Sequence, residues 1–213
     1  MARRPLICAV ALAFATFATF VPSAANAGPP LVAGERLPLA SKVMGEERTL
    51  FVSVPASYAR ETRRYPVLYL TDAETQFEHT SATAAFLARN GFMPETIVVG
   101  VTNTDRTRDL SPSRDPKFPT SGGADRFLDF FENELVPFVE ARYRTAPYRI
   151  FAGWSAGGIF AFHAMRVKPD LFQAVIAVSP WLVWDERKEL KLLAPFLAGG
   201  GVKTRVLFFT SGD

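Results

Sequence analysis

The fold of this chain is decided by the stretch Ile150-Phe-Ala-Gly-Trp-Ser-Ala-Gly-Gly158. An apolar run at 148–152 leads into a Gly-x-Ser-x-Gly-Gly motif, and a segment with helical character, 159–167, follows it. A strand, a sharp turn and a helix are the context in which such a motif places a serine at the tip of a strained turn. The sequence therefore predicts that the hydroxyl of Ser155 projects from the sheet as a nucleophile.

Glycines flank the serine at positions where a Cβ would collide with neighbouring backbone, namely Gly153 and Gly157. The amide of Ala156, at the start of the following helix, is predicted to point to the place where a tetrahedral oxyanion would form. The alternative is an ordinary glycine-rich turn, because Gly-x-Ser-x-Gly is a short pattern. The matching flanks on both sides favour the nucleophile.

The first 27 residues have the pattern of a secretory signal peptide. Arg3 and Arg4 precede an apolar run at 6–21, and Ala25-Asn-Ala27 is a small-x-small cleavage pattern. The alternative is a transmembrane anchor, which needs about 20 apolar residues and lacks a cleavage site. We therefore expect cleavage after Ala27, a mature domain at 28–213, no stable membrane anchor, and a periplasmic or secreted location.

The composition is that of one globular domain with a sizeable core: 213 residues, 48% hydrophobic and 21% charged. The only cysteine, Cys8, would leave with the signal peptide, which excludes disulfides and a cysteine nucleophile from the mature domain. The net charge of +3 becomes +1 without the two N-terminal arginines, and no basic stripe suggests nucleic acid as a partner. The sequence has no metal-ligand cluster and no phosphate loop, so no cofactor is expected.

Strand-like and helix-like segments alternate along the rest of the chain. Two strands at 37–44 and 48–54 are predicted to pair antiparallel around Gly45. The remaining strands are more continuously apolar, which predicts a mostly parallel sheet with helices on both faces. They are expected at 65–71, 96–101, 148–152, 172–179 and 203–210, with helices at 78–89, 125–143 and 159–167 and an irregular helix within 181–198. A long polar loop at 102–123 is of a kind that is usually functional or mobile.

Four segments, in this order, resemble the esterase branch of the α/β-hydrolases, which includes enterochelin esterase-like and esterase-D-like proteins and the antigen 85 acyltransferases. The segments lie at 65–72 (Tyr-Pro-Val-Leu-Tyr-Leu-Thr-Asp), 97–106 (including Asn-Thr-Asp-Arg), 153–158 (Gly-Trp-Ser-Ala-Gly-Gly) and 177–184 (Ala-Val-Ser-Pro-Trp, ending in Trp). The resemblance covers about residues 37–213. It implies an α/β-hydrolase fold and a Ser–acid–His triad that cleaves a small-molecule ester through an acyl-enzyme.

Carried over to this chain, the resemblance makes Ser155 the nucleophile and the amide of Ala156 one oxyanion donor. The second donor is expected in the turn after strand 65–71, where the amide of Ala73 is the candidate and Asp72 lies beside it. Many relatives carry a glycine in this turn, and this chain does not.

Asp72 and several larger side chains are candidates for contact with the substrate. Arg106 lies on the loop that relatives use to shape the pocket, and an arginine there could hold an anionic or phenolic group. Its alternative is a solvated surface side chain. Trp154 and Trp181 could line an apolar or aromatic pocket, as could Trp184, with core packing as the alternative for each.

The general base is not found in the expected place. This fold orders its triad as serine, acid and histidine, yet the only histidines are His79 and His163. His163 lies on the helix after Ser155, roughly 12 Å along its axis, and is interpreted as structural. His79, near the mouth of the site, could contact substrate. Asp213, the final residue, is a possible acid.

We therefore expect the chain to be part of a longer hydrolase, without its C-terminal histidine region, and incomplete at that end of the sheet. Alone it should show little esterase activity, because an unassisted serine is a poor nucleophile. It should also expose a strand edge. Acyl transfer to an alcohol, and a non-catalytic binding protein of the same fold, are the alternative functions. Siderophore lactones, aryl esters and short acyl esters are equally compatible substrates, and no oligomeric state is indicated.

Overall fold

The computed structural model describes residues 33–200 and 202–211. The predicted signal peptide and Asp213 lie outside these residues. Within them, no helix combines the length and the apolar character needed to cross a bilayer.

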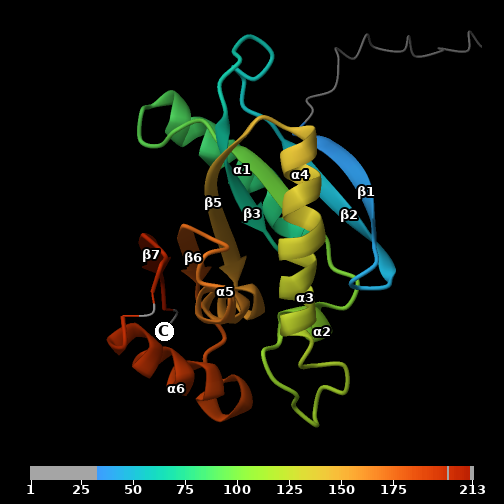
Figure 1. The fold of residues 1–213 in the computed structure, drawn as a ribbon, viewed down its shortest axis with the longest axis vertical. Helices are drawn as coiled ribbons and strands as arrows, with labels where there is room; N and C mark the ends of the chain where they lie inside the picture. Colours follow the sequence, from blue (N-terminus) through green and yellow to red (C-terminus); the bar gives the residue numbers. More distant parts are fainter. Residues whose placement is uncertain (1–32, 201, 212–213) are drawn as a thin grey trace, which may run out of the picture. The chain divides into compact units, whose positions relative to one another are not determined.

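Seven strands form one mixed sheet in the order β1-β2-β4-β3-β5-β6-β7 (Figure 1). The first two strands, β1 (Glu35–Ser41) and β2 (Glu46–Ser53), pair antiparallel, and β2 pairs antiparallel with β4. The other strands run parallel: β3 (Tyr65–Leu70), β4 (Ile97–Val101), β5 (Thr145–Trp154), β6 (Ala174–Val178) and β7 (Val206–Phe209). The predicted mostly parallel sheet with an antiparallel N-terminal hairpin is confirmed.

Helices cover both faces of the sheet because side chains alternate along its buried strands. On one face, α1 (Ala73–Arg89) packs through Phe77 against Leu68 and Leu70. On the other face, Tyr69 and Phe151 pack against the remaining helices, as in other parallel sheets. These helices are α3 (Ala124–Phe130), α4 (Val136–Arg142) and α5 (Ala156–Val167), and α6 (Trp184–Ala198) lies against α5.

The expected helix 125–143 is interrupted in the middle by a π-helical turn, Phe131–Leu135, which joins α3 to α4. Pro137 stands at the start of α4. Because proline has no amide proton and its ring crowds the preceding turn, a regular ladder cannot continue through it. A widened turn just before the proline is a common way to keep such a helix continuous.

Two helices begin earlier than their expected ranges: the helix after β3 begins at Ala73 rather than near 78, and α5 begins at Ala156 rather than at 159, although Ala156 was itself expected at a helix start. The loop 102–123 contains a short helix, α2 (Arg106–Leu110), whose N-terminus is capped by Asp105, the side chain of which accepts a hydrogen bond from the Arg108 amide at 2.9 Å. Local capping chemistry, which a coarse hydropathy pattern does not register, produces this helix.

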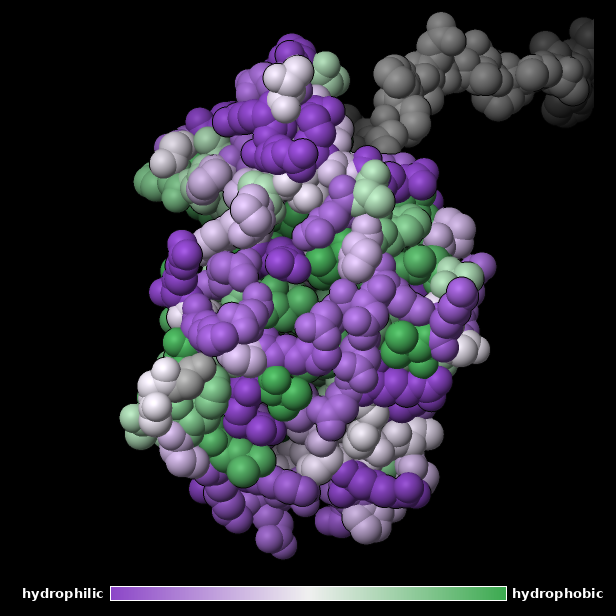
Figure 2. All heavy atoms as spheres, viewed as in Figure 1, coloured by the Kyte–Doolittle hydropathy of each residue, from purple (hydrophilic) through white to green (hydrophobic). Residues whose placement is uncertain are grey.

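Hydrophobic side chains show among hydrophilic ones at the lower left of the molecule, in the region of α6 (Figure 2). β7 is an edge strand of the described sheet. Its side chains Val206, Phe208 and Phe209 are 51%, 54% and 57% exposed.

Candidate active site

Ser155 occupies a strained corner between β5 and α5. Its backbone has φ 54° and ψ −110°, a conformation that residues other than glycine rarely adopt. The corner is held from both sides, because the Ser155 amide donates to the Val178 carbonyl and the Trp181 amide donates to the Ser155 carbonyl, both at 3.0 Å. Ser155 itself is exposed. This is the strand–turn–helix geometry that the motif predicted.

The glycines of the motif are needed for close approach of backbone. A Cβ on Gly153 would lie 2.1 Å from the Gly157 carbonyl oxygen, and one on Gly158 would lie 2.8 Å from Cα of Pro180. A Cβ on Gly157 would lie 2.6 Å from Oγ1 of Thr71. The glycines therefore let the serine turn pack directly against the segments that follow β3 and β6.

Left-handed backbone recurs where these neighbouring strands end. Asp72 after β3, Ser155 after β5 and Ser179 after β6 have φ values of 57°, 54° and 42°. The three strands are adjacent and parallel, so their carboxyl ends meet at one edge of the sheet. This edge is where ligands bind in open α/β sheets, and strained residues gather at functional sites.

Ser155 lies at the edge of an open pocket of about 330 Å³. The pocket is lined by the turn after β6 and by the end of β7: Ser179, Pro180, Trp181, Leu182, Val183, Phe209, Thr210 and Ser211. The structure thus brings the predicted Trp181 next to the serine. Its ring lies 5.0 Å from the ring of Trp184 and 6.0 Å from that of Phe118. Trp184 is buried and donates its indole N–H to the Ser113 carbonyl, which fits core packing.

Ala73 and Ala156, the two predicted oxyanion donors, are the first residues of α1 and α5. Amides in the first turn of a helix have no intrahelical acceptor, and the helix dipole favours negative charge there. Because β3 and β5 are adjacent, the two helix starts lie at the same edge of the sheet. The side chain of Ala73 is buried against Gly100, and a Cβ added to Gly100 would lie only 2.7 Å from the Cβ of Ala73.

Arg106 and Asp72, predicted to contact substrate, contact each other. The guanidinium of Arg106 donates through Nε to Oδ1 of Asp72 at 2.6 Å and through Nη2 to Oδ2 at 3.0 Å. Asn103 adds a hydrogen bond to Oδ1 at 2.7 Å. The hydrogen bond to Asp72 raises the pKa of Arg106 above its ordinary value. Asn103 was not singled out as a site residue, although its place three positions before Arg106 on the same loop is a usable signal.

Trp154 does not line the pocket of Ser155. It faces the side of the sheet covered by α1, where it borders an apolar pocket of about 230 Å³ with Leu68 and Ile150. The ring of His79 meets it edge-on at 5.9 Å. Strand alternation accounts for this placement, because consecutive side chains on β5 point to opposite faces.

His163 is buried and both of its ring nitrogens are engaged. Nε2 lies 2.7 Å from Oδ1 of Asp125, and Nδ1 lies 3.2 Å from Oε2 of Glu189. Burial alone would raise the pKa of Glu189, but hydrogen bonds from His163 and Arg166 lower it below its ordinary value. The cluster ties α3, α5 and α6 together, which agrees with a structural role for His163.

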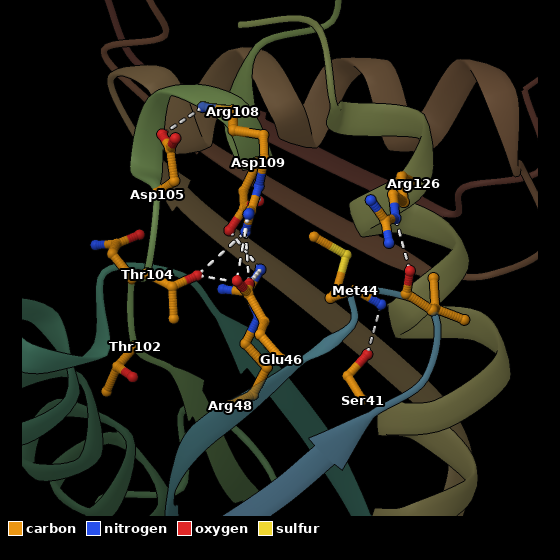
Figure 3. Close-up of polar contacts among 12 residues, drawn as sticks. Ser41, Met44, Glu46, Arg48, Thr102, Thr104, Asp105, Arg108, Asp109 and Arg126 are labelled. Atoms are coloured by element: carbon orange, nitrogen blue, oxygen red, sulfur yellow. Dashed lines mark hydrogen bonds and ion pairs between the residues drawn. The ribbon is translucent and has the colours of Figure 1, made fainter. Parts of the chain in front are cut away.

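The loop that carries Arg106 is anchored to β2 by a buried ion pair (Figure 3). The Arg48 side chain is fully buried and lies 2.6 Å from Asp109, which is 1% exposed. Arg108 and Glu46 complete the network. The sequence analysis did not single out this pair, although the alternation of β2 places Arg48 on the same buried side as Leu50 and Val52.

Among the described residues, no group of His, Cys, Asp and Glu is arranged to hold a metal ion. Asp213, the candidate acid, lies outside these residues.

The chain matches a family model described as "Putative esterase" over residues 41–200. It is 31% identical over 178 residues to ferri-bacillibactin esterase BesA of Bacillus subtilis, covering 72% of this chain and 61% of that protein. It is 32% identical over 164 residues to the siderophore enterobactin esterase of Emericella nidulans, covering 63% of this chain and 52% of that protein. The chain thus spans between half and two thirds of these curated relatives.

Solved structures give the same result. The crystal structure of an IroE-like serine hydrolase from Shewanella oneidensis superposes with a TM-score of 0.78 and 34% identity, covering 83% of this chain and 60% of that one. The siderophore hydrolase EstA from Aspergillus nidulans superposes with a TM-score of 0.74 and 26% identity, covering 88% of this chain and 73% of that one. With the matched family model and the strained serine corner, these likenesses establish that the chain belongs to the putative esterase family of the α/β-hydrolase fold.

Proposed function

We propose that this chain carries the nucleophile and the oxyanion hole of a carboxylic ester hydrolase that acts through an acyl-enzyme on Ser155. The observation that carries the proposal is the conformation of Ser155, an exposed serine held at φ 54° between β5 and α5. A left-handed serine costs about 1–3 kcal/mol. An ordinary turn would avoid this cost by placing glycine there.

In the proposed reaction the Ser155 hydroxyl attacks the ester carbonyl while a general base takes its proton. The amides of Ala156 and Ala73, at the two helix starts, stabilise the resulting oxyanion. Removing one such donor typically lowers kcat by about 10²–10³-fold. The alcohol leaves with a proton, and water then hydrolyses the acyl-enzyme by the same steps.

The substrate that we propose is a siderophore ester or lactone. The support comes from relatives named as ferri-bacillibactin, enterobactin and triacetylfusarinine C esterases. The open pocket beside Ser155 agrees with an aromatic substrate, since Trp181 and Phe209 offer aromatic surface at its wall. Aromatic rings of this kind stack on planar groups.

The general base is not assigned to a described residue. His163 holds Asp125 and Glu189 with its two nitrogens, and His79 packs on Trp154 outside the Ser155 pocket. We therefore propose that the 213-residue chain alone hydrolyses esters weakly. We also keep as a proposal that the protein is exported by the N-terminal signal.

The test compares the chain with the longest polypeptide that its gene encodes, on a p-nitrophenyl ester and on a trilactone siderophore. We expect the longer protein to hydrolyse both and the 213-residue chain to be much slower. Ser155→Ala should lower kcat by at least about 10³-fold. Normal turnover by Ser155→Ala, or no labelling of the longer protein by a fluorophosphonate, would rule out a serine acyl-enzyme.

A further inference from the structure

We infer that Arg106 is a positioning residue that keeps the Asp72 carboxylate away from the amides at the start of α1, so that the Ala73 amide is free to bind the oxyanion. The inference rests on the proposed function. It replaces the expectation that Arg106 itself binds substrate with a role exerted through Asp72.

The first observation is that Asp72 does not cap its own helix. Asp72 is the residue immediately before α1, the position where an aspartate side chain usually accepts hydrogen bonds from first-turn amides. Its side chain makes no such bond. A carboxylate is also drawn to this place by the helix dipole. The left-handed backbone of Asp72 (φ 57°, ψ 38°) differs from the extended backbone of an ordinary N-cap, and its carboxylate binds Arg106 and Asn103 instead.

The second observation is the strength of what holds it. Arg106 binds both carboxylate oxygens, at 2.6 Å and 3.0 Å, and Asn103 binds Oδ1 at 2.7 Å. Bidentate arginine–carboxylate pairs are the strongest and most directional side-chain hydrogen bonds. The Asp72 side chain is only 8% exposed and that of Arg106 is 42% exposed, so solvent reaches the pair from the arginine side alone.

The third observation is where the pair sits. Arg106 Nη2 also lies 3.4 Å from the carbonyl oxygen of Trp154, which is the residue directly before Ser155. Oδ2 of Asp72 would be 3.7 Å from a Cβ placed on Gly157. The pair thus joins the turn after β3 to the turn that carries Ser155. A carboxylate released at this place would put a negative charge where the proposed oxyanion develops.

The support for Arg106 is itself rigid. Arg106 is the first residue of α2, whose N-terminus is capped by Asp105. The fourth residue of the helix, Asp109, is buried in the ion pair with Arg48. Since both anchors lie outside the pocket of Ser155, α2 presents the guanidinium to Asp72 without a contribution from substrate.

The test is a double-mutant cycle in the longest polypeptide that the gene encodes, with kcat measured on a p-nitrophenyl ester. Arg106→Ala should lower kcat by about 100-fold, because the Asp72 carboxylate, no longer neutralised, would repel the oxyanion that develops beside the Ala73 amide. In an Asp72→Gly background, where glycine suits the φ of 57°, the same substitution should lower kcat by less than about 3-fold, as expected for strongly coupled sites. Arg89→Ala, an exposed arginine at the far end of α1, is the matched control and should not change kcat.

An equal loss in both backgrounds would overturn the inference and indicate that Arg106 binds substrate or only supports the fold. No loss in either background would overturn it as well. A crystal structure of Arg106→Ala decides independently of activity: the Asp72 carboxylate turned onto the first amides of α1 supports the inference, and an unmoved carboxylate contradicts it. If the unmutated protein is inactive, the proposed function fails while this structural outcome still decides the inference.

Discussion

Removing the carboxylate of Asp109 should destabilise the fold more than the loss of any surface ion pair among the described residues. Arg48 is fully buried and Asp109 is 1% exposed, at 2.6 Å from each other. The Nε and Nη1 atoms of Arg48 already have no hydrogen-bond partner. Without Asp109, the buried Arg48 keeps only the partly exposed Glu46 as a counter-ion, at 2.9 Å, and removing one partner of a buried ion pair costs about 3–5 kcal/mol. In a domain of this size each kcal/mol shifts Tm by about 2–4 °C, so Asp109→Ala should lower Tm by about 6–20 °C.

The assay is thermal and urea unfolding followed by circular dichroism. The matched control is Asp170→Ala, because Asp170 also lies 2.6 Å from its partner, Lys203, but the two side chains are 73% and 60% exposed. It should change stability by less than about 1 kcal/mol. The double variant Arg48→Met/Asp109→Leu, which removes both charges, should recover most of the loss. The reasoning is refuted if Asp109→Ala is no more damaging than Asp170→Ala, or if the double variant is as unstable as the single one.

Three other outcomes are expected. Gly153→Ala should lower the free energy of unfolding by about 3 kcal/mol or more, since its Cβ would meet backbone at 2.1 Å. Gly200→Ala is the control: its φ is +71° but the space around it is open, so it should cost about 1 kcal/mol. The midpoints of urea unfolding of the two variants measure the difference. The hydrogen bond from Arg108 lowers the pKa of Glu46 below its ordinary 4.5. The ionised Glu46 carboxylate therefore contributes fully to stability above about pH 5, and this contribution is lost as the pH falls through the lowered pKa. Glu46→Gln should accordingly reduce the fall of Tm on the acidic side of a Tm–pH curve. Trp184→Phe removes the indole N–H that donates to Ser113 and should cost about 1 kcal/mol at unchanged far-UV dichroism; an unchanged urea midpoint would contradict this.

The parts of the fold that could be predicted are those governed by period and by motif. Buried strands such as β3 and β4 are continuous apolar runs, and the sharp turn around Ser155 is specified by glycines whose Cβ atoms would have no room. These features depend on a few consecutive residues. For that reason the order of elements and the strained corner at Ser155 could be predicted directly from the sequence.

The parts that could not be predicted depend on partners distant in sequence. Arg106 was considered as a substrate contact or a solvated side chain because a loop arginine shows no partner in the sequence, whereas in the structure Asp72, 34 positions away, binds it. Arg48 and Asp109 form a buried ion pair although they are 61 positions apart. A hydropathy pattern treats each of them as a polar residue and so predicts that both are exposed. The placement of Trp154 away from the Ser155 pocket follows from strand alternation, but only once the bounds of β5 are known.

The left-handed residues after β3, β5 and β6 have a consequence for how this protein would respond to laboratory evolution. Asp72, Ser155 and Ser179 each keep a conformation that glycine adopts more easily. A screen that rewarded heat resistance alone would therefore favour Ser155→Gly, which relieves the strained backbone and removes the hydroxyl that we propose as the nucleophile.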